Sequence, residues 1–233
     1  GRDNLIKDSV ILPASQLFRD VYNENILPKL SLEYLYVLRW VHLMQEGTLR
    51  LFDSNGHYLK QIPIVNLTAR TGYLQLDSNI DHITQGTFRQ GSANIDYIVD
   101  PFISESGMGP TQRVLDITAN DLAKTRLFGF QSYTKYLEYC NGRQFRKYKD
   151  LEDFIDPERI ELLKEQYEHI DDIDLLAGIW LEKKMKDANV PPTFYCIVVE
   201  QLTRNVVSDR HWFERPNRPN AFNNSNKYLE LVG

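Results

Sequence analysis

Cysteine is scarce in this sequence: only Cys140 and Cys196 occur among 233 residues. So few cysteines exclude a scaffold held by many disulfides, and they leave two alternatives, one bridge or two buried free thiols. The two residues lie 196 − 140 = 56 positions apart. Closing a loop of that length would stabilise the fold by roughly 4 kcal/mol in the chain-entropy model. The cysteine count alone does not choose between the alternatives.

The sequence also lacks long apolar runs, an excess of positive charge and a visible leader segment. No run of about 18 apolar residues is present, so the sequence predicts no membrane span. The 27 basic residues are outnumbered by 32 acidic ones, for a formal net charge of −5. This argues against nucleic acid as a partner, because no basic stripe can neutralise phosphates. No signal peptide is visible, and the start at Gly1-Arg2-Asp3-Asn4 is typical of a processed or trimmed end.

What is present is the composition of a globular protein, with 42% hydrophobic and 25% charged residues. A chain of this length can form one good-sized core or two small ones. No internal repeat, low-complexity tract or domain boundary interrupts it. We therefore predict a single domain over residues 1–233.

Helical patterns dominate the chain. Apolar spacing through Leu35, Leu38 and His42 predicts a helix over 31–44 with these side chains on its buried face. Alternation over 48–52, followed by the turn residues 53–56, predicts a short β-hairpin. Further helices are predicted weakly over 77–100 and clearly over 133–139, 156–167, 171–184 and 192–207, whereas 116–122 is ambiguous. The fold class is mainly α with short β-hairpin pieces.

Several motifs follow one another in a fixed order. They are Leu38-Arg39-Trp40-Val41-His42, Leu115-Asp116-Ile117, Arg126-Leu127-Phe128-Gly129, Pro192-Thr193-Phe194-Tyr195-Cys196 and Asp209-Arg210-His211-Trp212-Phe213-Glu214. Over about residues 38–232 this order resembles the animal haem peroxidases. The first motif is similar to that family's Phe-Arg-x-Gly-His, and the third to its Arg-Asp-His-Gly. The resemblance implies the family's helical fold, with this chain as the C-terminal part of a larger peroxidase-like domain.

The resemblance also implies roles for particular residues. His42 matches the residue that binds the haem iron, and a neutral imidazole suits such an axial position. Arg39 lies three residues earlier on the same face and would meet a haem propionate. Cys140 and Cys196 match a pair that the family bridges. Without the resemblance, His42 would be interpreted as a core histidine bonded to a backbone carbonyl.

Departures from the family pattern concern the same site. Val41 replaces the glycine before the histidine, and Leu127 and Phe128 replace an Asp-His pair. The asparagine that normally accepts the ring N–H of the iron-binding histidine has no clear counterpart. His42 is the first histidine of the chain, so the distal histidine would have to come from an upstream segment. We therefore expect no catalytic residue on this chain and a tightly held partner, the N-terminal half of the same precursor as a separate chain; an oligomer is a further expectation.

Two sequons, at Asn66 and Asn223, predict glycosylation sites. Together with the expected disulfide they favour a secreted, extracellular protein. The other histidines, at positions 57, 82, 169 and 211, lack metal-ligand spacing, so no zinc site is predicted. Asp171, Asp172 and Asp174 could suggest calcium, but a negatively charged helix start explains them better.

Two functions follow from these observations. One is a divergent secreted haem peroxidase that uses peroxide to oxidise donors, with activity impaired by the lost motif residues. The alternative is a non-catalytic pseudo-peroxidase that serves as an extracellular binding, matrix or storage module. A helical interaction protein unrelated to peroxidases would require the ordered motifs to match by chance.

Overall fold

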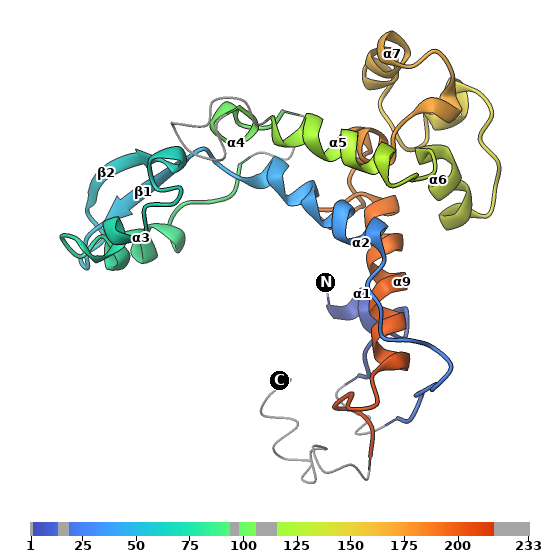
Figure 1. Ribbon diagram of the computed structural model, residues 1–233, viewed down its shortest axis with the longest axis horizontal. Coiled ribbons are helices and arrows are strands. Elements are labelled where there is room, and N and C mark those ends of the chain that lie inside the picture. Colours follow the sequence, from blue (N-terminus) through green and yellow to red (C-terminus); the bar gives the residue numbers. More distant parts are fainter. Residues whose placement is uncertain (1, 14–18, 94–97, 106–115, 217–233) are drawn as a thin grey trace. The chain divides into compact units, whose positions relative to one another are not determined.

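Figure 1 shows the computed structural model of the chain, which describes residues 2–13, 19–93, 98–105 and 116–216. The chain divides into two compact units, one made of residues 1–37 and 184–233 and the other of residues 38–183. Helices predominate in both, and the described strands form one two-stranded sheet. The predicted mainly α fold is thus confirmed. In the described part of the chain, no helix combines the length and apolarity needed to cross a bilayer.

The unit made from both chain ends is organised around one long helix. Helix α9 (Pro192–Ser208) starts with a proline in its first turn, where the missing N–H costs nothing. Helix α2 (Leu32–Val37) packs against it, and α1 (Arg2–Lys7) belongs to the same unit. The fully buried Gln201 of α9 accepts a hydrogen bond from the Ser31 N–H at 2.8 Å and donates one to the Lys29 carbonyl at 2.9 Å. This polar side chain ties the segment before α2 to the long helix.

A second buried polar group in this unit explains the last of the ordered motifs. Glu214 is fully buried, and its carboxylate accepts hydrogen bonds from Arg19 Nε at 2.8 Å, the Leu12 N–H at 2.9 Å and Trp212 Nε1 at 3.0 Å. A buried charge is tolerated where such donors surround it. Glu214 therefore fastens the N-terminal segment to the residues that follow α9.

The other unit contains the predicted hairpin, with β1 (Thr48–Phe52) antiparallel to β2 (Tyr58–Pro63). The turn is organised by Asp53, whose carboxylate accepts from the backbone N–H groups of Asn55 and His57. Helix α3 (Asn79–Thr87) lies directly on β1, and the approach is so close that a Cβ on Gly86 would come within 1.9 Å of the Arg50 carbonyl oxygen. Glycine is therefore required where this helix crosses the strand.

Short helices build the rest of this unit. In chain order they are η1 (Leu38–Met44), η2 (Ile64–Asn66), η3 (Thr71–Gln75), α4 (Pro101–Ser104), α5 (Ile117–Leu127), α6 (Tyr133–Asn141), η4 (Tyr148–Leu151), α7 (Pro157–Gln166), η5 (Ile170–Asp172) and α8 (Leu175–Leu181), where η marks a 3-10 helix. Helices α6 and α8 pack together around Tyr133, which is fully buried and donates a hydrogen bond to Glu182 at 2.8 Å. Gly178 gives the Tyr133 ring its space.

Several predicted boundaries were wrong. The helix expected over 31–44 is two helices of different kinds, because α2 ends at Val37 and η1 continues as a 3-10 helix. The expected buried face was wrong too: Leu35 is 42% exposed, whereas Val37, Trp40 and Leu43 are buried. A 3-10 helix has three residues per turn rather than 3.6, so the apolar positions rotate to another face.

Other predictions agree closely with the structure. The hairpin, α6, α7 and α9 are confirmed, and Gly142 ends α6 in the left-handed conformation that glycine favours. The helix predicted from position 171 begins only at Leu175, because residues 170–172 form η5. The ambiguous segment 116–122 is the start of α5, with Asp116 as its cap.

Candidate functional site

His42 lies on the C-terminal half of η1 and is half-buried. The buried side chains of Trp40 and Leu43 on either side of it fix this helix in the core, and α8 packs against it. No hydrogen bond joins a ring nitrogen of His42 to another described residue. The imidazole is therefore held in place by its helix, and neither ring nitrogen is engaged by the described part of the chain.

A partly buried ion pair joins η1 to α5. Asp121 of α5 is 1% exposed, and Nη1 of Arg39 lies 3.2 Å from its Oδ1 and 3.4 Å from its Oδ2. The contact with Oδ1 does not have hydrogen-bond geometry, so that oxygen is buried without a hydrogen-bond donor. Such an unpaired buried acceptor costs about 1–3 kcal/mol. Natural proteins leave few buried polar groups in this state.

The electrostatics of the three residues are coupled. Burial lowers the pKa of the His42 imidazole below its ordinary value; Asp121 opposes this shift and Arg39 adds to it. Burial also raises the pKa of the Asp121 carboxyl, which the positive charges of Arg39 and His42 partly offset. At neutral pH His42 is therefore mainly the neutral imidazole, the form that binds a metal ion.

None of the three departures from the family motif, at Val41, Leu127 and Phe128, gives the backbone a positive φ. Val41 is 50% exposed and has no positive φ, so a side chain is accommodated where the family carries glycine. Leu127 and Phe128 lie at the end of α5 and are 80% and 49% exposed. Two apolar side chains thus lie at the surface at the positions where the resemblance predicts an Asp-His pair.

Asp121 is the residue that the sequence analysis missed. It lies in the segment that the apolar pattern left ambiguous, since α5 carries few large apolar side chains. A signal was nevertheless present: Asp116 caps the helix by accepting from the N–H groups of Thr118 and Ala119, both at 3.0 Å. From that start, Asp121 and Thr125 fall on one face four residues apart, and both are buried.

The cysteine prediction is confirmed. Cys140 of α6 and Cys196 of α9 are both disulfide-bonded, and no free cysteine remains. Since the chain has two cysteines in all, they are bonded to each other.

The two sequons differ in what the structure shows. Asn66 ends η2 and is exposed, with Thr68 two residues later in the sequon. An exposed asparagine is accessible to glycosylation. Asn223 lies outside the described residues.

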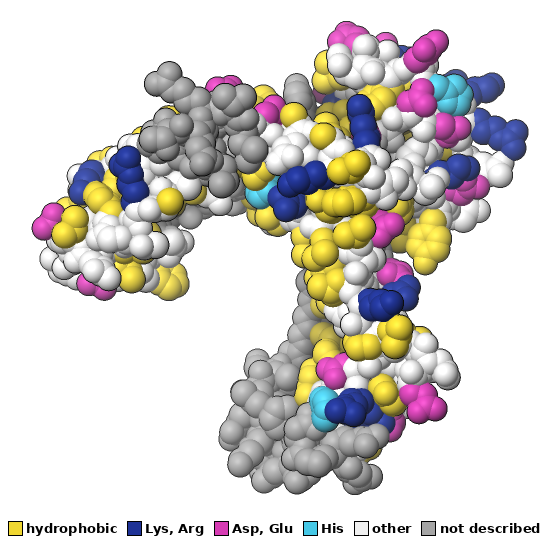
Figure 2. Space-filling view, in the orientation of Figure 1, with side chains coloured by type: hydrophobic (Ala, Val, Ile, Leu, Met, Phe, Trp, Pro, Cys, Tyr) yellow, Lys and Arg dark blue, Asp and Glu magenta, His cyan; other side chains and the backbone are white. Residues whose placement is uncertain are grey.

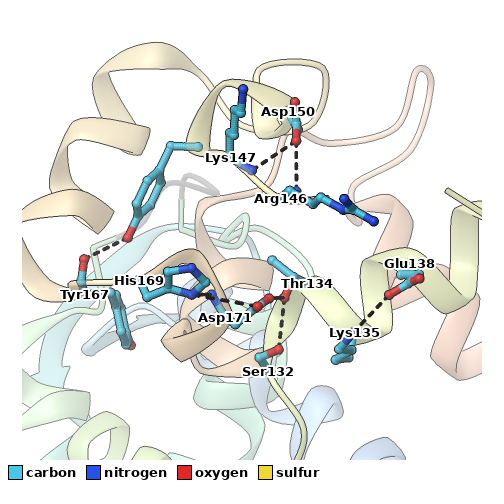
Figure 3. A network of polar contacts seen from close by, with 11 residues as sticks. Ser132, Thr134, Lys135, Glu138, Arg146, Lys147, Asp150, Tyr167, His169 and Asp171 are labelled. Atoms are coloured by element: carbon cyan, nitrogen blue, oxygen red, sulfur yellow. Dashed lines mark hydrogen bonds and ion pairs between the residues drawn. The ribbon is translucent and has the colours of Figure 1, made fainter. Parts of the chain in front are cut away.

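The carboxylates of Asp171 and Asp174, which the sequence analysis considered for calcium, form hydrogen bonds and an ion pair within the protein. Thr134 donates to Asp171 at 2.8 Å, the Ser132 and Thr134 hydroxyls lie 2.9 Å apart, and His169 caps η5 by accepting from the Asp171 N–H at 3.1 Å. Figure 3 shows these residues side by side. Asp174 pairs with Arg126 at 2.6 Å and accepts a hydrogen bond from Tyr167 at 2.8 Å. These two carboxylates therefore connect α5, α6 and the start of α8.

Other titratable clusters are few. His57 is 77% exposed and pairs with Asp53 in the hairpin turn. Among the described residues, no group of three or more His, Cys, Asp or Glu side chains could hold a metal ion. A haem iron needs only one side chain on its proximal side, so the donor chemistry at His42 fits that group.

Comparisons with known proteins agree with the sequence motifs. The family model "Animal haem peroxidase" matches residues 2–228. Peroxidase of Drosophila melanogaster is 30% identical over 230 residues, which cover 95% of this chain and 33% of that protein. Peroxinectin A of Dictyostelium discoideum is 26% identical over 200 residues, which cover 84% of this chain and 36% of that protein. The chain thus spans about a third of the length of these relatives.

Solved structures show the same likeness. Peroxidase A from Dictyostelium discoideum superimposes with a TM-score of 0.71 and 26% identity, over 84% of this chain and 38% of that one. A fatty acid alpha-dioxygenase from Oryza sativa matches with a TM-score of 0.70 and 20% identity, over 92% of this chain and 38% of that one. At such low identity the second match shows the fold alone.

Proposed function

Because the chain belongs to the animal haem peroxidase family, we propose that it forms the proximal part of a peroxidase domain, in which His42 binds the haem iron. One observation carries the proposal: a half-buried imidazole, kept neutral by burial, lies on a well-packed helix at the position of the family's iron-binding motif. Bound haem would supply peroxide-dependent oxidation of a donor. The chain's own part is to bind and orient that group.

Arg39 has a supporting role in this proposal. Its side chain is 39% exposed and carries a positively charged guanidinium. From one turn before His42 it brings positive charge to the side on which haem carboxylates would lie. The same guanidinium contacts Asp121, so it links the ligand helix to α5.

An absorbance titration tests haem binding directly. We expect the chain to give a Soret band between 350 and 450 nm when haemin is added, and His42→Ala to abolish it. His57→Ala is the matched control, because it removes an exposed histidine of the hairpin turn and should leave the band unchanged. A wild-type chain that stays colourless, or an equal band in His42→Ala, would contradict the proposal.

A partner chain is part of the same proposal. The exposed apolar side chains Leu27, Leu30, Leu32 and Leu35 precede or belong to α2 and range from 42% to 58% exposed. Figure 2 shows hydrophobic side chains at the surface over α2 and α9. Apolar surface of this kind favours a bound partner. We propose the N-terminal part of the same peroxidase domain, which would also supply the distal histidine.

Gel filtration tests the partner. The chain alone should self-associate. When it is co-expressed with the N-terminal part, the two should elute together as a complex. A well-behaved monomer with a cooperative melt would contradict this expectation.

An extracellular location is supported by the disulfide and by the exposed Asn66. Secretion from animal cells should give a product whose mass falls on treatment with peptide-N-glycosidase. The decrease should be smaller in Asn66→Gln. Equal mass before and after treatment in the wild type would remove glycosylation from the proposal.

A non-catalytic pseudo-peroxidase is the second candidate, and one observation favours it. Leu127 and Phe128 stand in place of the family's Asp-His pair and are exposed, so the polar chemistry of that motif is absent. Haem and metal analysis separates the two candidates. A folded, glycosylated protein that contains neither would favour a binding, matrix or storage module.

A further inference from the structure

We propose that the connection between α6 and α7 binds a sulfated polysaccharide through the cationic side chains of residues 143–149. The whole surface belongs to one unit of the chain, residues 38–183. The inference needs no haem. It rests on the proposed function in one respect, since the extracellular location is the reason to expect a polysaccharide rather than a nucleic acid.

The first argument is the local concentration of positive charge. Residues 143–149 contain four basic residues and no acidic one, although acidic residues outnumber basic ones by 32 to 27 in the whole chain. Figure 2 shows Lys and Arg side chains at the surface of this region, at the upper right. The four cationic residues are all exposed, namely Arg143, Arg146, Lys147 and Lys149. The negative net charge of the chain therefore does not describe this surface.

The second argument is the direction of the nearest carboxylate. Oδ2 of Asp150 accepts hydrogen bonds from the backbone N–H groups of Arg146 and Lys147, at 2.9 and 3.0 Å. Figure 3 shows this carboxylate turned to the backbone, while the side chains of Arg146 and Lys147 lead away from it in different directions. Asp150 thus shapes the connection and leaves both cationic groups at the surface.

The other acidic residues nearby do not neutralise the cluster. Asp153 pairs with Arg143 at 2.6 Å, so these two charges offset each other. Glu152 is exposed, and Lys183 donates a hydrogen bond to its carbonyl at 2.8 Å. Within the described part of the chain, no ion pair engages the three remaining cations, Arg146, Lys147 and Lys149. They are available to a ligand.

The third argument is the ordered base beneath the cations. Phe145 is 5% exposed and packs edge-on against Phe154, with ring centroids 5.6 Å apart. The Arg143 guanidinium lies over both rings, at 4.9 and 5.5 Å from their centroids. Tyr148 donates a hydrogen bond to the Tyr167 carbonyl at 2.8 Å. A backbone fixed in this way loses little conformational entropy when a ligand binds.

The arrangement also indicates the class of ligand. Because the side chains of Arg146 and Lys147 diverge, one small anion cannot contact both, whereas a polymer with repeated anionic groups can. Exposed ion pairs are individually weak and are screened by salt, so such a ligand gains affinity from several contacts and from the release of its counterions. A guanidinium and two ammonium groups suit the oxygens of sulfate groups.

The experiment measures the binding of fluorescent heparin to the whole chain by anisotropy. The cluster variant, Arg146→Gln/Lys147→Gln/Lys149→Gln, removes the three unpaired cations. A cation near a densely anionic surface contributes about fivefold in affinity, so we expect this variant to bind roughly 100-fold more weakly at low salt. Its dependence on salt should also be less steep than that of the wild type.

A matched control removes the same net charge from the other unit. Lys7→Gln/Lys184→Gln/Lys186→Gln replaces three exposed lysines and should bind heparin as tightly as the wild type. Circular dichroism should give both variants the melting temperature of the wild type, since exposed cations contribute little to stability. If the cluster variant melts earlier, Arg146→Gln, Lys147→Gln and Lys149→Gln are measured singly, and each should weaken binding by about fivefold.

Three results would overturn the proposal. They are a wild type that does not bind heparin, equal affinities of the cluster and control variants, and equally tight binding of hyaluronan, which carries carboxylates but no sulfate. Duplex DNA bound more tightly than heparin, with the same loss in the cluster variant, would make a nucleic acid the partner instead.

The outcomes remain separate from those of the haem titration. Heparin binding is measured without haem, and none of the substituted residues belongs to the proposed haem site. A wild type with a Soret band but no affinity for heparin would refute this inference alone. A colourless wild type that binds heparin through the cluster would refute haem binding alone.

Discussion

At the scale of single residues, the buried carboxylates of Glu214 and Asp121 have opposite surroundings. Glu214 has three donors within 3.0 Å, whereas one oxygen of Asp121 has none. The first arrangement is typical of a group that holds a fold together, and the second leaves one buried acceptor without a donor among the described residues. Their variants should therefore behave differently.

We expect Glu214→Ala to lower the free energy of unfolding by about 3–5 kcal/mol, because it leaves the Arg19 guanidinium without its buried partner. Urea unfolding followed by circular dichroism measures this loss. Glu161→Ala is the control, since Glu161 is 66% exposed in its pair with Lys164 and surface pairs contribute at most about 1 kcal/mol. Equal effects of the two substitutions would refute the role given to Glu214.

Tyr167 gives a pH dependence. Burial and the hydrogen bond to Asp174 raise its pKa to about 12, whereas an unfolded tyrosine titrates near 10. The native state therefore favours the protonated phenol, and this contribution to stability is present below pH 10 and is lost as the pH rises from 10 to 12. Between pH 10 and 12 the melting temperature of Tyr167→Phe should fall less steeply than that of the wild type. The melting temperature of the exposed control Tyr139→Phe should fall as steeply as that of the wild type. Identical slopes in the wild type and Tyr167→Phe would contradict the assignment.

His42 and Arg39 became candidates from the sequence because they lie in one of the ordered motifs, and the two cysteines because the family that these motifs resemble pairs them. Asp121 could not, since its ion pair with Arg39 joins segments 82 positions apart. Its own segment offered no apolar periodicity to place it. Only the fold brings its carboxylate to the helix of His42.

At the scale of elements, the crossing of α3 over β1 depends on one glycine. Gly86→Ala should destabilise the protein by about 1–3 kcal/mol, because its Cβ would meet the backbone of β1 and overpacked contacts carry this cost. Gly91→Ala is the matched control, with nothing within 4 Å of its Cβ, and thermal denaturation compares the two. Similar melting temperatures would mean that α3 moves away from β1 without loss.

Elements with strong end signals were predicted well. The hairpin turn, the Asn-Gly end of α6 and the prolines that open α7 and α9 all fix the backbone locally. The 3-10 helix η1 was not predicted, since apolar residues three and four apart fit both kinds of helix over so short a segment. Packing of Trp40 and Leu43 into the core decides its geometry.

At the scale of the whole molecule, the bond between Cys140 and Cys196 is the main covalent constraint. Replacing both cysteines by serine should lower the free energy of unfolding by about 4 kcal/mol, because the open chain regains the entropy of a closed loop of 56 residues. Guanidinium titrations measure this loss, and wild type treated with dithiothreitol should behave as the variant does. A variant as stable as the oxidised wild type would show that the bridge constrains nothing.

The family could be recognised from the sequence because the ordered motifs extend over most of the chain. The N-terminal partner was inferred from the same resemblance and stays a prediction. Its support in the structure is the exposed apolar surface, which the composition of the chain did not reveal.

The bridge also determines how the chain would respond to proteolysis. Lys184 and Lys186 are exposed between α8 and α9, inside the loop that the two sulfurs close. Trypsin cutting there would give two fragments that still migrate together on a denaturing gel. They would separate into two bands only after a reducing agent is added.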